Sequence, residues 1–330
     1  MNRSNYQIHL KLDECTQCGK SPVIEQRYSD RNLCRSCFIE SIENRIKRMI
    51  SRSKLWTPED QLIIGLSGGK DSIALLYNLN KLLLNNDNLN SITALIIDEG
   101  IKGYRDKSVE FAKAFCEKLD VEYKIISFRR RVGMTLDEII KTMKGKENKR
   151  YSCNYCAIIR RRLLNEGAKE LKGTVLAMGH NLTDIAETYL MNILYKRFYL
   201  IGNQYIFRER SKTLKKYYVK KITPLMHIPE EEIFLYCNLK NLRYYRSHCP
   251  YREEEPITRK KVLQIIQRLK NLVPEIEYNL LESFLRLSKI LYKNRDKIKP
   301  QVNYNFCKNC GYPCSNGKTC TYCKYIEKFT

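Results

Sequence analysis

The sequence has 330 residues, of which 43% are hydrophobic and 29% charged, a globular composition that excludes fibrous and disordered chains. No apolar run approaches the roughly 20 residues of a membrane helix, and residues 1–12 lack the apolar core of a signal peptide, so we expect a cytoplasmic protein without a membrane segment. The net charge of +24 predicts a polyanionic partner, unless an AT-rich genome has inflated the lysine content.

The first of the fourteen cysteines form two Cys-x-x-Cys pairs, Cys15 with Cys18 and Cys34 with Cys37, separated by fifteen residues. Without a secretion signal, cysteines in this number indicate metal ligands or catalysis rather than disulfides. The spacing is typical of a zinc ribbon or treble clef, in which four thiolates close a structural site. Apolar residues at helical spacing then predict a helix over 38–52, so residues 1–50 form a zinc-binding domain with a linker helix.

A glycine-containing stretch, Gln61–Ser72, opens the central part of the chain, residues 51–300. It predicts a buried strand over Leu62–Leu66, a loop with two adjacent glycines, and a helix from Ser72. Glycine lets the backbone approach a ligand, and loop N–H groups at a helix N-terminus form an anion site. The pattern Ser-Gly-Gly-Lys-Asp-Ser is not a Walker A loop and resembles the PP-loop of ATP pyrophosphatases. A turn that merely favours glycine is the alternative interpretation.

The segments that follow alternate between strands and helices. Such alternation predicts an α/β fold with a doubly wound parallel sheet, whose ligands bind at the carboxyl ends of the strands. Three loops follow strands at that edge and should converge, namely 67–72, 98–105 and 179–184. The predicted strands are 62–66, 91–98, 122–128 and 174–178, and the predicted helices are 72–84, 107–119, 136–144, 156–171 and 185–195.

The segment from Arg197 to Lys221 is rich in basic and aromatic residues. Cations beside rings suit phosphate contacts and stacking on unpaired bases, whereas a half-exposed β-hairpin is the alternative interpretation. Its aromatic residues include Tyr199, Tyr205, Phe207, Tyr217 and Tyr218.

The last part of the chain carries helices and a second cysteine group. Pro229 and the acids after it predict a helix start, and residues 257–292 predict one or two helices broken at Pro274. Residues 301–330 repeat the paired cysteine spacing and predict a second structural zinc ribbon. Cys314 lies inside its loop and is either a bystander or an alternative ligand. The four predicted ligands are Cys307, Cys310, Cys320 and Cys323.

Three further cysteines, Cys153, Cys156 and Cys249, have no place in the ribbons. A third zinc finger would need a second pair close to Cys153-x-x-Cys156, and none follows. A redox dithiol at a helix start is one interpretation. The other is an iron–sulfur cluster to which Cys249 adds a third ligand, so that one iron stays open. Spacing alone does not separate the two. Cys116 and Cys237 fall on apolar helix faces and are expected to be buried bystanders.

In their order, these motifs resemble the TtuA/NcsA family of tRNA 2-thiouridine synthetases over almost the whole chain. The resemblance implies that ATP, split between its α and β phosphates, adenylates the C2 oxygen of a tRNA uridine, which sulfur then replaces. It also implies an iron–sulfur cluster of the 4Fe-4S type on the three cysteines. The motifs are the two ribbons, Ser-Gly-Gly-Lys-Asp-Ser, Asp98-Glu-Gly-Ile-Lys-Gly-Tyr-Arg105, Cys153-x-x-Cys156, Gly-His-Asn-Leu-Thr-Asp184 and Cys249-Pro-Tyr.

The resemblance also implies roles for single residues. Lys70 would neutralise developing charge, and Asp71 or Asp184 would hold Mg²⁺. Some family members have lysine four residues after the second cluster cysteine, where this chain has Arg160; arginine cannot act as a base, and this variant resembles the wobble-uridine branch. The implied nucleotide-binding residues are Ser67, Gly68, Gly69, Lys70, Asp71, Ser72, Asp98, Gly179 and His180. The implied catalytic residues are Lys70, Cys156, Arg160 and Asp184.

The implied partners are tRNA and a sulfur donor, either sulfide or a thiocarboxylated ubiquitin-like carrier, and family habit favours a homodimer. Arg161 and Arg162 extend the same basic helix and are expected to be solvated or to face tRNA. Three alternatives stay open: a tRNA 2-thiocytidine synthase, an inert zinc-containing RNA-binding protein, and a redox dithiol enzyme without a cluster.

Overall fold

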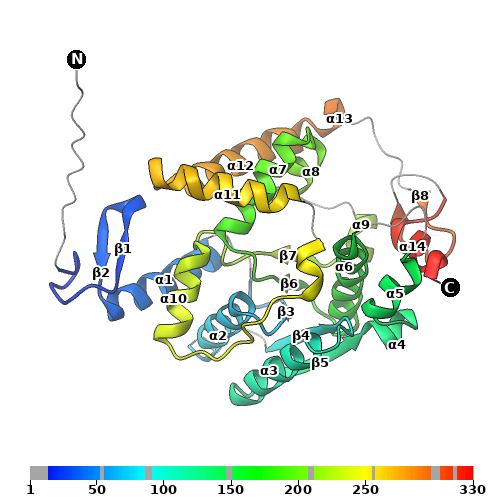
Figure 1. Cartoon of the computed structure of the whole chain (residues 1–330), viewed down its shortest axis with the longest axis horizontal. Helices are drawn as coiled ribbons and strands as arrows, with labels where there is room; N and C mark the ends of the chain where they lie inside the picture. Colours follow the sequence, from blue (N-terminus) through cyan, green and yellow to red (C-terminus); the bar gives the residue numbers. More distant parts are fainter. Residues whose placement is uncertain are drawn as a thin grey trace.

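A computed structural model describes residues 14–52, 56–85, 91–145, 151–206, 212–254, 257–298, 305–314 and 318–329. Its centre is a five-stranded sheet of order β5-β4-β3-β6-β7 in which all neighbours are parallel (Figure 1). The doubly wound α/β prediction is therefore confirmed. The strands are β3 (Leu62–Gly65), β4 (Ile92–Asp98), β5 (Glu122–Ser127), β6 (Val175–Ala177) and β7 (Lys220–Ile222).

Alternate residues of the buried strands supply two hydrophobic cores, one on each face of the sheet. Leu62 and Ile64 of β3 face the first core, and Ile63 between them faces the second. Helices α1 (Arg35–Arg52), α2 (Lys70–Leu84), α3 (Arg105–Lys118) and α10 (Glu230–Leu239) cover the first face. Helices α4 (Phe128–Val132), α5 (Leu136–Met143) and α6 (Ser152–Glu170) cover the second.

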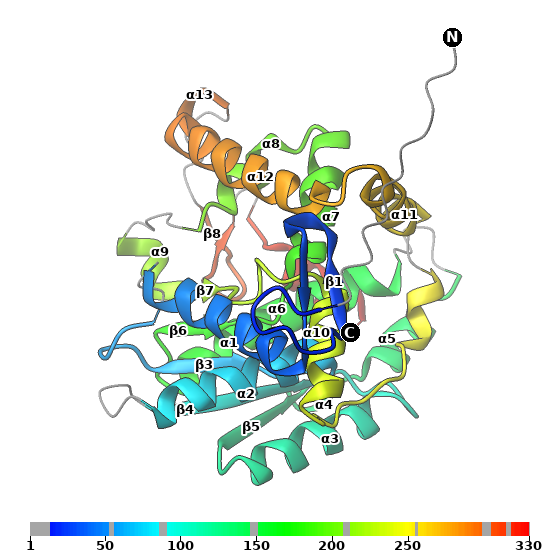
Figure 2. The same ribbon diagram turned by 90° about the vertical axis from the view of Figure 1, so that its left-hand side faces the viewer.

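A helical layer stands beyond the sheet, in the upper part of Figure 2. Helix α12 packs against α7 and α8, and α11 also packs against α7. Pro274 lies in the break between α11 and α12, as the sequence predicted. The layer consists of α7 (Leu182–Leu194), α8 (Phe198–Asn203), α11 (Ile257–Leu272), α12 (Ile276–Lys293) and α13 (Arg295–Ile298).

The hairpin interpretation of residues 197–221 is wrong in the described part of that segment. It forms α8, a short helix α9 (Lys212–Tyr217) and the beginning of the edge strand β7, whereas Phe207 lies outside the described residues. Strand β7 escaped prediction because its three residues, Lys-Lys-Ile, bury only the last side chain. Backbone pairing with β6, rather than side-chain alternation, holds it in the sheet.

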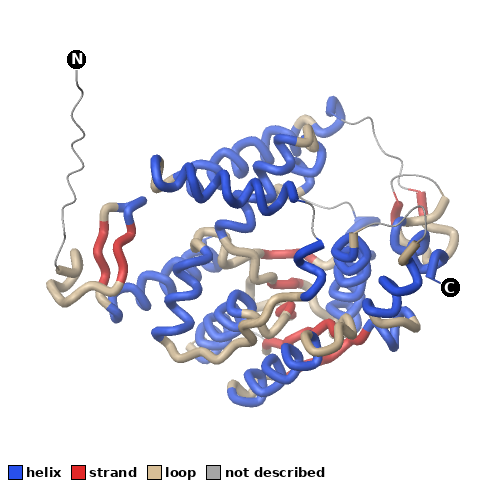
Figure 3. The backbone as a smooth tube through the Cα atoms, in the orientation of Figure 1, coloured by secondary structure: helices blue, strands red, loops and turns tan. Residues whose placement is uncertain are grey.

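A small hairpin marks each end of the described chain (Figure 3). The first pairs β1 (Ile24–Gln26) with β2 (Arg31–Leu33), and the second pairs β8 (Asn305–Phe306) with β9 (Pro313–Cys314) before helix α14 (Thr321–Phe329). Among the described residues, no helix combines the length and hydrophobicity needed to cross a membrane.

Candidate active site

The loop after β3 has a backbone that only glycine can form. Gly68 has φ +85°, and a Cβ built there would lie 2.2 Å from the Ser108 carbonyl oxygen. The Ser72 hydroxyl accepts a hydrogen bond from Ser67 N at 3.1 Å and donates one to Gly69 O at 3.0 Å. Helix α2 begins at Lys70, so its first-turn N–H groups have no partner within the helix. The loop is thus a preformed cradle suited to phosphate oxygens.

The loop after β6 lies directly against this cradle. A Cβ on Gly179 would lie 3.1 Å from the backbone of both Asp71 and Ser72. Asn181 caps α7 by accepting from Asp184 N at 2.9 Å, while an Asp184 carboxylate oxygen accepts from Asn181 N at 3.2 Å. The Asn181 amide also donates to Asp71 at 3.1 Å. The two loops therefore form one surface, and the cap fixes the Asp184 carboxylate beside it.

The charges of the cradle are linked to helix α10. The Lys70 ammonium forms ion pairs with Asp71 at 3.0 Å and with Glu230 at 2.7 Å. Burial raises the pKa of Asp71, although Lys70 opposes the rise. Lys70 is thus already matched by two carboxylates, and an incoming phosphate has to compete with Glu230 for it.

A buried carboxylate, that of Glu99, joins the cradle to helix α6. Glu99 is 4% exposed and pairs with Arg105 Nε at 2.6 Å through one oxygen and with Arg160 at 3.4 Å through the other. Arg105, equally buried, donates from its guanidinium to the Ser67 carbonyl oxygen at 2.7 Å. Asp98, which directly precedes Glu99, accepts a hydrogen bond from Gly100 N at 2.9 Å and so stabilises the turn of its own loop. A continuous set of polar contacts runs from Ser67 to Arg160.

Cys153 and Cys156 lie in the first turn of α6, which begins four residues earlier than predicted. Cys249 immediately precedes a 3₁₀ segment, Pro250–Glu254, that packs against α6. Both Cys156 and Cys249 pack on the second core, and burial raises the pKa of the Cys156 thiol to about 12, with Arg160, Glu99 and Cys249 among the charges acting on it. The structure therefore brings Cys249 to the helix that carries the other two cysteines.

The charges of Asp184 and Arg160 both act on His180. Burial lowers its pKa, and the charges that act on it most belong to Asp184, Arg160, Lys221 and Arg161. The charge of Arg160 thus acts on both Cys156 and His180, and Arg160 pairs with Glu99. The three loops predicted to converge do share one region at the carboxyl edge of the sheet.

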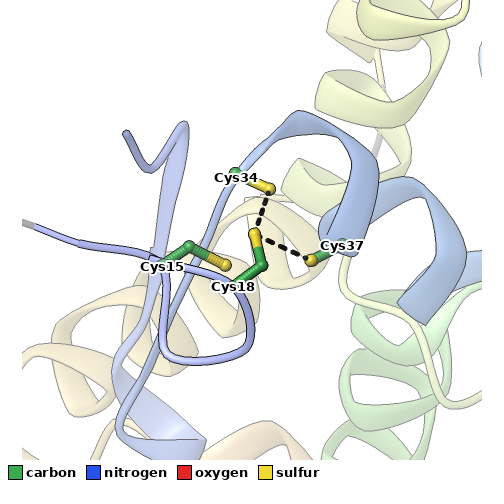
Figure 4. A group of neighbouring side chains, drawn as sticks. All are labelled: Cys15, Cys18, Cys34 and Cys37. Carbon is green, nitrogen blue, oxygen red and sulfur yellow. Dashed lines mark hydrogen bonds between the residues drawn. The ribbon is translucent and has the colours of Figure 1, made fainter. Parts of the chain in front are cut away.

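The structure gathers four cysteines at each of the two predicted zinc ribbons. Each group places its four sulfurs within 4.8 Å of one another: Cys15, Cys18, Cys34 and Cys37 in the first, and Cys307, Cys310, Cys320 and Cys323 in the second. Figure 4 shows the four side chains of the first group gathered together. Cys314, in β9, is not a member of the second group. Both sets offer four thiolates, the donors that suit a closed tetrahedral zinc site.

The cysteines Cys153, Cys156 and Cys249 are not gathered as closely as those of the two ribbons. Within the described parts of the chain, only the two ribbon groups bring three or more possible ligand atoms within 4.8 Å. Ligands of one zinc ion must be that close, whereas the cysteines of an iron–sulfur cluster bind different irons and stand farther apart. Each of the three is partly exposed, so an inorganic cluster has access to the sulfurs.

Comparisons with known proteins find matches along almost the whole chain. The PP-loop domain family matches residues 39–263, and the N-terminal LIM domain of 2-thiouridine synthetase TtuA matches residues 14–39. A probable sulfurtransferase of Methanocaldococcus jannaschii is 35% identical over 98% of this chain and 90% of its own length. The chain belongs to the TtuA/NcsA family of PP-loop tRNA sulfurtransferases.

Two further TtuA/NcsA relatives carry more specific names. A tRNA-5-methyluridine(54) 2-sulfurtransferase of Pyrococcus horikoshii is 30% identical over 94% of this chain and 93% of its own. The solved structure of U34-tRNA thiolase NcsA from Methanococcus maripaludis, with its 4Fe-4S cluster, is 31% identical, with a TM-score of 0.78 and coverage of 96% and 97%. Relatives named for different uridines are thus about equally similar to this chain.

Within the motif Asp98–Arg105, the sequence pattern suggested a role only for Asp98. The structure shows that Glu99 and Arg105 make the contacts that join the two halves of the site. The available signal was an acid followed six residues later by an arginine, just after a buried strand rich in apolar residues. Arg162 also differs from expectation: its side chain is 11% exposed and packs on the C-terminal ribbon, so it is neither solvated nor open to tRNA.

Proposed function

We propose that this chain is an ATP-dependent tRNA uridine 2-thiolase that adenylates the C2 oxygen of the wobble uridine and then replaces that oxygen with sulfur. The observation that carries the proposal is the buried Glu99, whose carboxylate contacts Arg105 at the phosphate cradle and Arg160 beside Cys156. Activation and sulfur transfer must act on the same oxygen in succession, so a thiolase needs its nucleotide and sulfur sites adjacent.

At the nucleotide end, the N–H groups of Gly69, Lys70 and Asp71 would hold the β and γ phosphates of ATP, and Lys70 would leave Glu230 for the charge that develops. Asp71 and Asp184 would present oxygen ligands to Mg²⁺. Asp98 would face the nucleoside. The full proposed set is Ser67, Gly68, Gly69, Lys70, Asp71, Ser72, Asp98, Gly179 and His180.

At the sulfur end, Cys153, Cys156 and Cys249 would hold the cluster, which would supply a binding point for the incoming sulfur. Arg160 stays charged at every working pH, so its proposed role is to clamp the adenylate phosphate rather than to move a proton. Asp184, fixed by its capping box, is the proposed general base. Adenylation of the C2 oxygen would release pyrophosphate. Hydrosulfide would then add at C2 and AMP would leave with the original oxygen, so that a C–S bond replaces the C–O bond.

The assignment to the wobble uridine rests on Arg160, because the TtuA/NcsA resemblance associates arginine here with that branch. We also propose two structural zinc ions, one in each ribbon, a cytoplasmic homodimer, and sulfide or a thiocarboxylated carrier as sulfur donor. The proposed division is residues 1–50, 51–300 and 301–330.

The deciding experiment is mass spectrometry of tRNA nucleosides from cells that lack this gene. Loss of a wobble 2-thiouridine derivative, restored by the wild-type gene but not by Cys249→Ser or Asp184→Asn, is the expected result. Loss of 2-thiocytidine would instead identify the sister activity. An unchanged thionucleoside pool would leave an RNA-binding protein without thiolase chemistry and refute the proposal.

A further inference from the structure

Tyr155 lies between the two cysteines at the start of α6, and its ring is 1% exposed. Two rings of α14 enclose it: Tyr325, at a centroid distance of 4.9 Å and an angle of 62°, and Phe329, at 5.5 Å and 74°. Both are edge-to-face geometries, the favoured arrangement of packed aromatic rings. The turn of α6 that carries Cys153 and Cys156 is therefore seated on the last helix of the described chain.

Helix α14 is itself anchored in the C-terminal cysteine group. It begins at Thr321, directly after Cys320, and contains Cys323, so two of the four grouped thiols belong to its first turn or precede it. Besides α6 it packs against α5 (Figure 1), and its rings complete the second core. An ion in the cysteine group would therefore fix the first turn of α14, two residues before Tyr325, whereas Phe329 lies at the other end of the helix.

A second contact ties the ribbon to the next turns of α6. The Arg162 guanidinium lies over the Tyr312 ring at 3.0 Å from its centroid and 5.3 Å from that of Tyr322. Glu166 accepts from Arg162 Nε at 2.5 Å, which holds the guanidinium in place, and the Asn165 amide reaches the Tyr312 hydroxyl at 3.5 Å. Helix α6 is thus held by the ribbon at Tyr155 and again about two turns further on.

We propose that the C-terminal zinc ribbon is a positioning element for the cysteine pair of α6. Zinc bound by Cys307, Cys310, Cys320 and Cys323 orders α14; α14 seats Tyr155; and Tyr155 sets the first turn of α6 in the arrangement that accepts a cluster. The cluster itself rests on the function proposed above. Loss of this zinc therefore loosens the cysteine pair.

The N-terminal cysteine group provides a matched comparison because it packs elsewhere. Glu232 of α10 accepts hydrogen bonds from Gln26 and Tyr28 of the N-terminal unit, each at 2.7 Å, and pairs with Arg45 of α1. These contacts lead to the face of the sheet opposite α6. Removing the N-terminal or the C-terminal zinc thus removes one ion from four thiolates, but only the C-terminal group packs against α6.

The test compares full-length Cys320→Ser/Cys323→Ser with Cys34→Ser/Cys37→Ser, measuring zinc per chain, iron per chain after anaerobic reconstitution, and hydrogen exchange of residues 151–160 in iron-free protein. Each double variant should lose one zinc. Only the C-terminal variant should retain iron about tenfold less well and exchange faster at α6, as for a lost supporting group. Equal iron and exchange in both variants would overturn the proposal.

A second set of variants leaves all zinc ligands intact, in case the first fails to fold. Tyr155→Leu should lower iron retention and speed exchange at α6, whereas Tyr155→Phe keeps the ring and should restore both. Tyr189→Leu is the control, since Tyr189 is a buried ring packed on Phe284 at 5.8 Å outside α6. Wild-type iron and exchange in Tyr155→Leu, or the same losses in Tyr189→Leu, would overturn the proposal.

These measurements are independent of thiolation. A wild-type protein that takes up iron but thiolates no tRNA would refute the proposed function and leave the zinc-to-α6 coupling standing. If the wild type takes up no iron, the cluster is refuted, and exchange at residues 151–160 alone decides the coupling: faster exchange in the C-terminal variant supports it, and unchanged exchange overturns it.

Discussion

Glu99 is the residue on which the two ends of the site depend most directly. Its carboxylate and the Arg105 guanidinium are each about 5% exposed, so each is the other's counter-ion in a region from which water is excluded. Such a pair adds little net stability over apolar residues of the same size, but breaking it strands a buried charge. The geometry of the cradle is therefore sensitive to a residue that touches no phosphate.

Replacing this carboxylate should destabilise the fold. We expect Glu99→Gln to lower the free energy of unfolding by about 3 kcal/mol, because Arg105 stays charged and buried without its partner. Denaturant unfolding monitored by circular dichroism would measure the loss. Glu138→Gln is the matched control: its pair with Arg129 is exposed, so the expected change is about 1 kcal/mol or less. Equal losses in both variants would contradict the prediction.

Asp184 allows structure and chemistry to be separated at a single atom. In Asp184→Asn, the remaining carbonyl oxygen can still accept from Asn181 N, so the cap of α7 and the unfolding midpoint should hardly change. An amide cannot take up a proton, so the thiolation rate should fall by about 10²-fold or more. Single-turnover assays of 2-thiouridine formation would measure it; wild-type rates would remove Asp184 from the mechanism.

His227 should make stability depend on pH. Burial and then the charge of Arg45 lower its pKa below the ordinary 6.5, so the unfolded chain binds this proton more readily than the folded one. Its contribution is therefore fully present above pH 6.5 and is lost as the pH falls below 6.5 towards the folded pKa. Unfolding midpoints at pH 7.5 and roughly 5.5 should differ less in His227→Gln than in the wild type.

Comparing wild type with His227→Gln corrects the pH dependence for zinc loss. Any zinc lost in acid is lost by both proteins and cancels in their difference, which isolates the histidine. The prediction fails if the two proteins show the same pH dependence.

At the scale of elements, the loop after β3 should tolerate no side chain at Gly68. Gly68→Ala should abolish ATP binding, because the added Cβ meets the Ser108 carbonyl and the backbone must move. Gly103→Ala is the control: its φ is also positive, at +75°, but nothing lies within 4 Å of the added Cβ, so only strain of about 1–2 kcal/mol is expected. Isothermal titration with ATP would compare them; equal affinities would contradict a steric cause.

The elements also show which information the sequence holds. The largely apolar strand β4 could be predicted from its run of buried residues, and the amphipathic helices α11 and α12 from the helical spacing of their apolar residues. Strand β7 and helix α4 could not, since Lys-Lys-Ile and Phe-Arg-Arg-Arg-Val owe their conformation to backbone pairing and to the Ser127 cap. The spacing of apolar residues reveals neither the backbone pairing of β7 nor the cap of α4.

The site divides in the same way. The cradle and the cysteine pairs are local motifs, and chain order sufficed to find them. That Cys249 would meet α6, and that Glu99 would span to Arg160, depends on contacts between residues 61 or more positions apart, for which spacing gives no rule. The partnership of Arg162 with Tyr312 is likewise tertiary, which explains why a basic helix face was expected to be solvated.

At the scale of the whole molecule, the charge of +24 has a measurable consequence. If it serves RNA binding, affinity for tRNA should fall by about 10³-fold or more between roughly 50 and 200 mM salt, as counter-ions released from six or more phosphates require. Fluorescence anisotropy with labelled tRNA across that range would measure the slope. An affinity indifferent to salt would make the charge a by-product of lysine-rich composition.

The two oxygens of Glu99 also have a bearing on timing. Arg160 is half exposed and free to turn towards an arriving anion, whereas Arg105 is enclosed. RNA that draws Arg160 away would leave Arg105, which also donates to the Ser67 carbonyl oxygen, as the sole counter-ion of Glu99. Docking of tRNA at one end would thereby change the charge balance at the nucleotide loop, so that ATP cleavage could depend on the presence of the uridine.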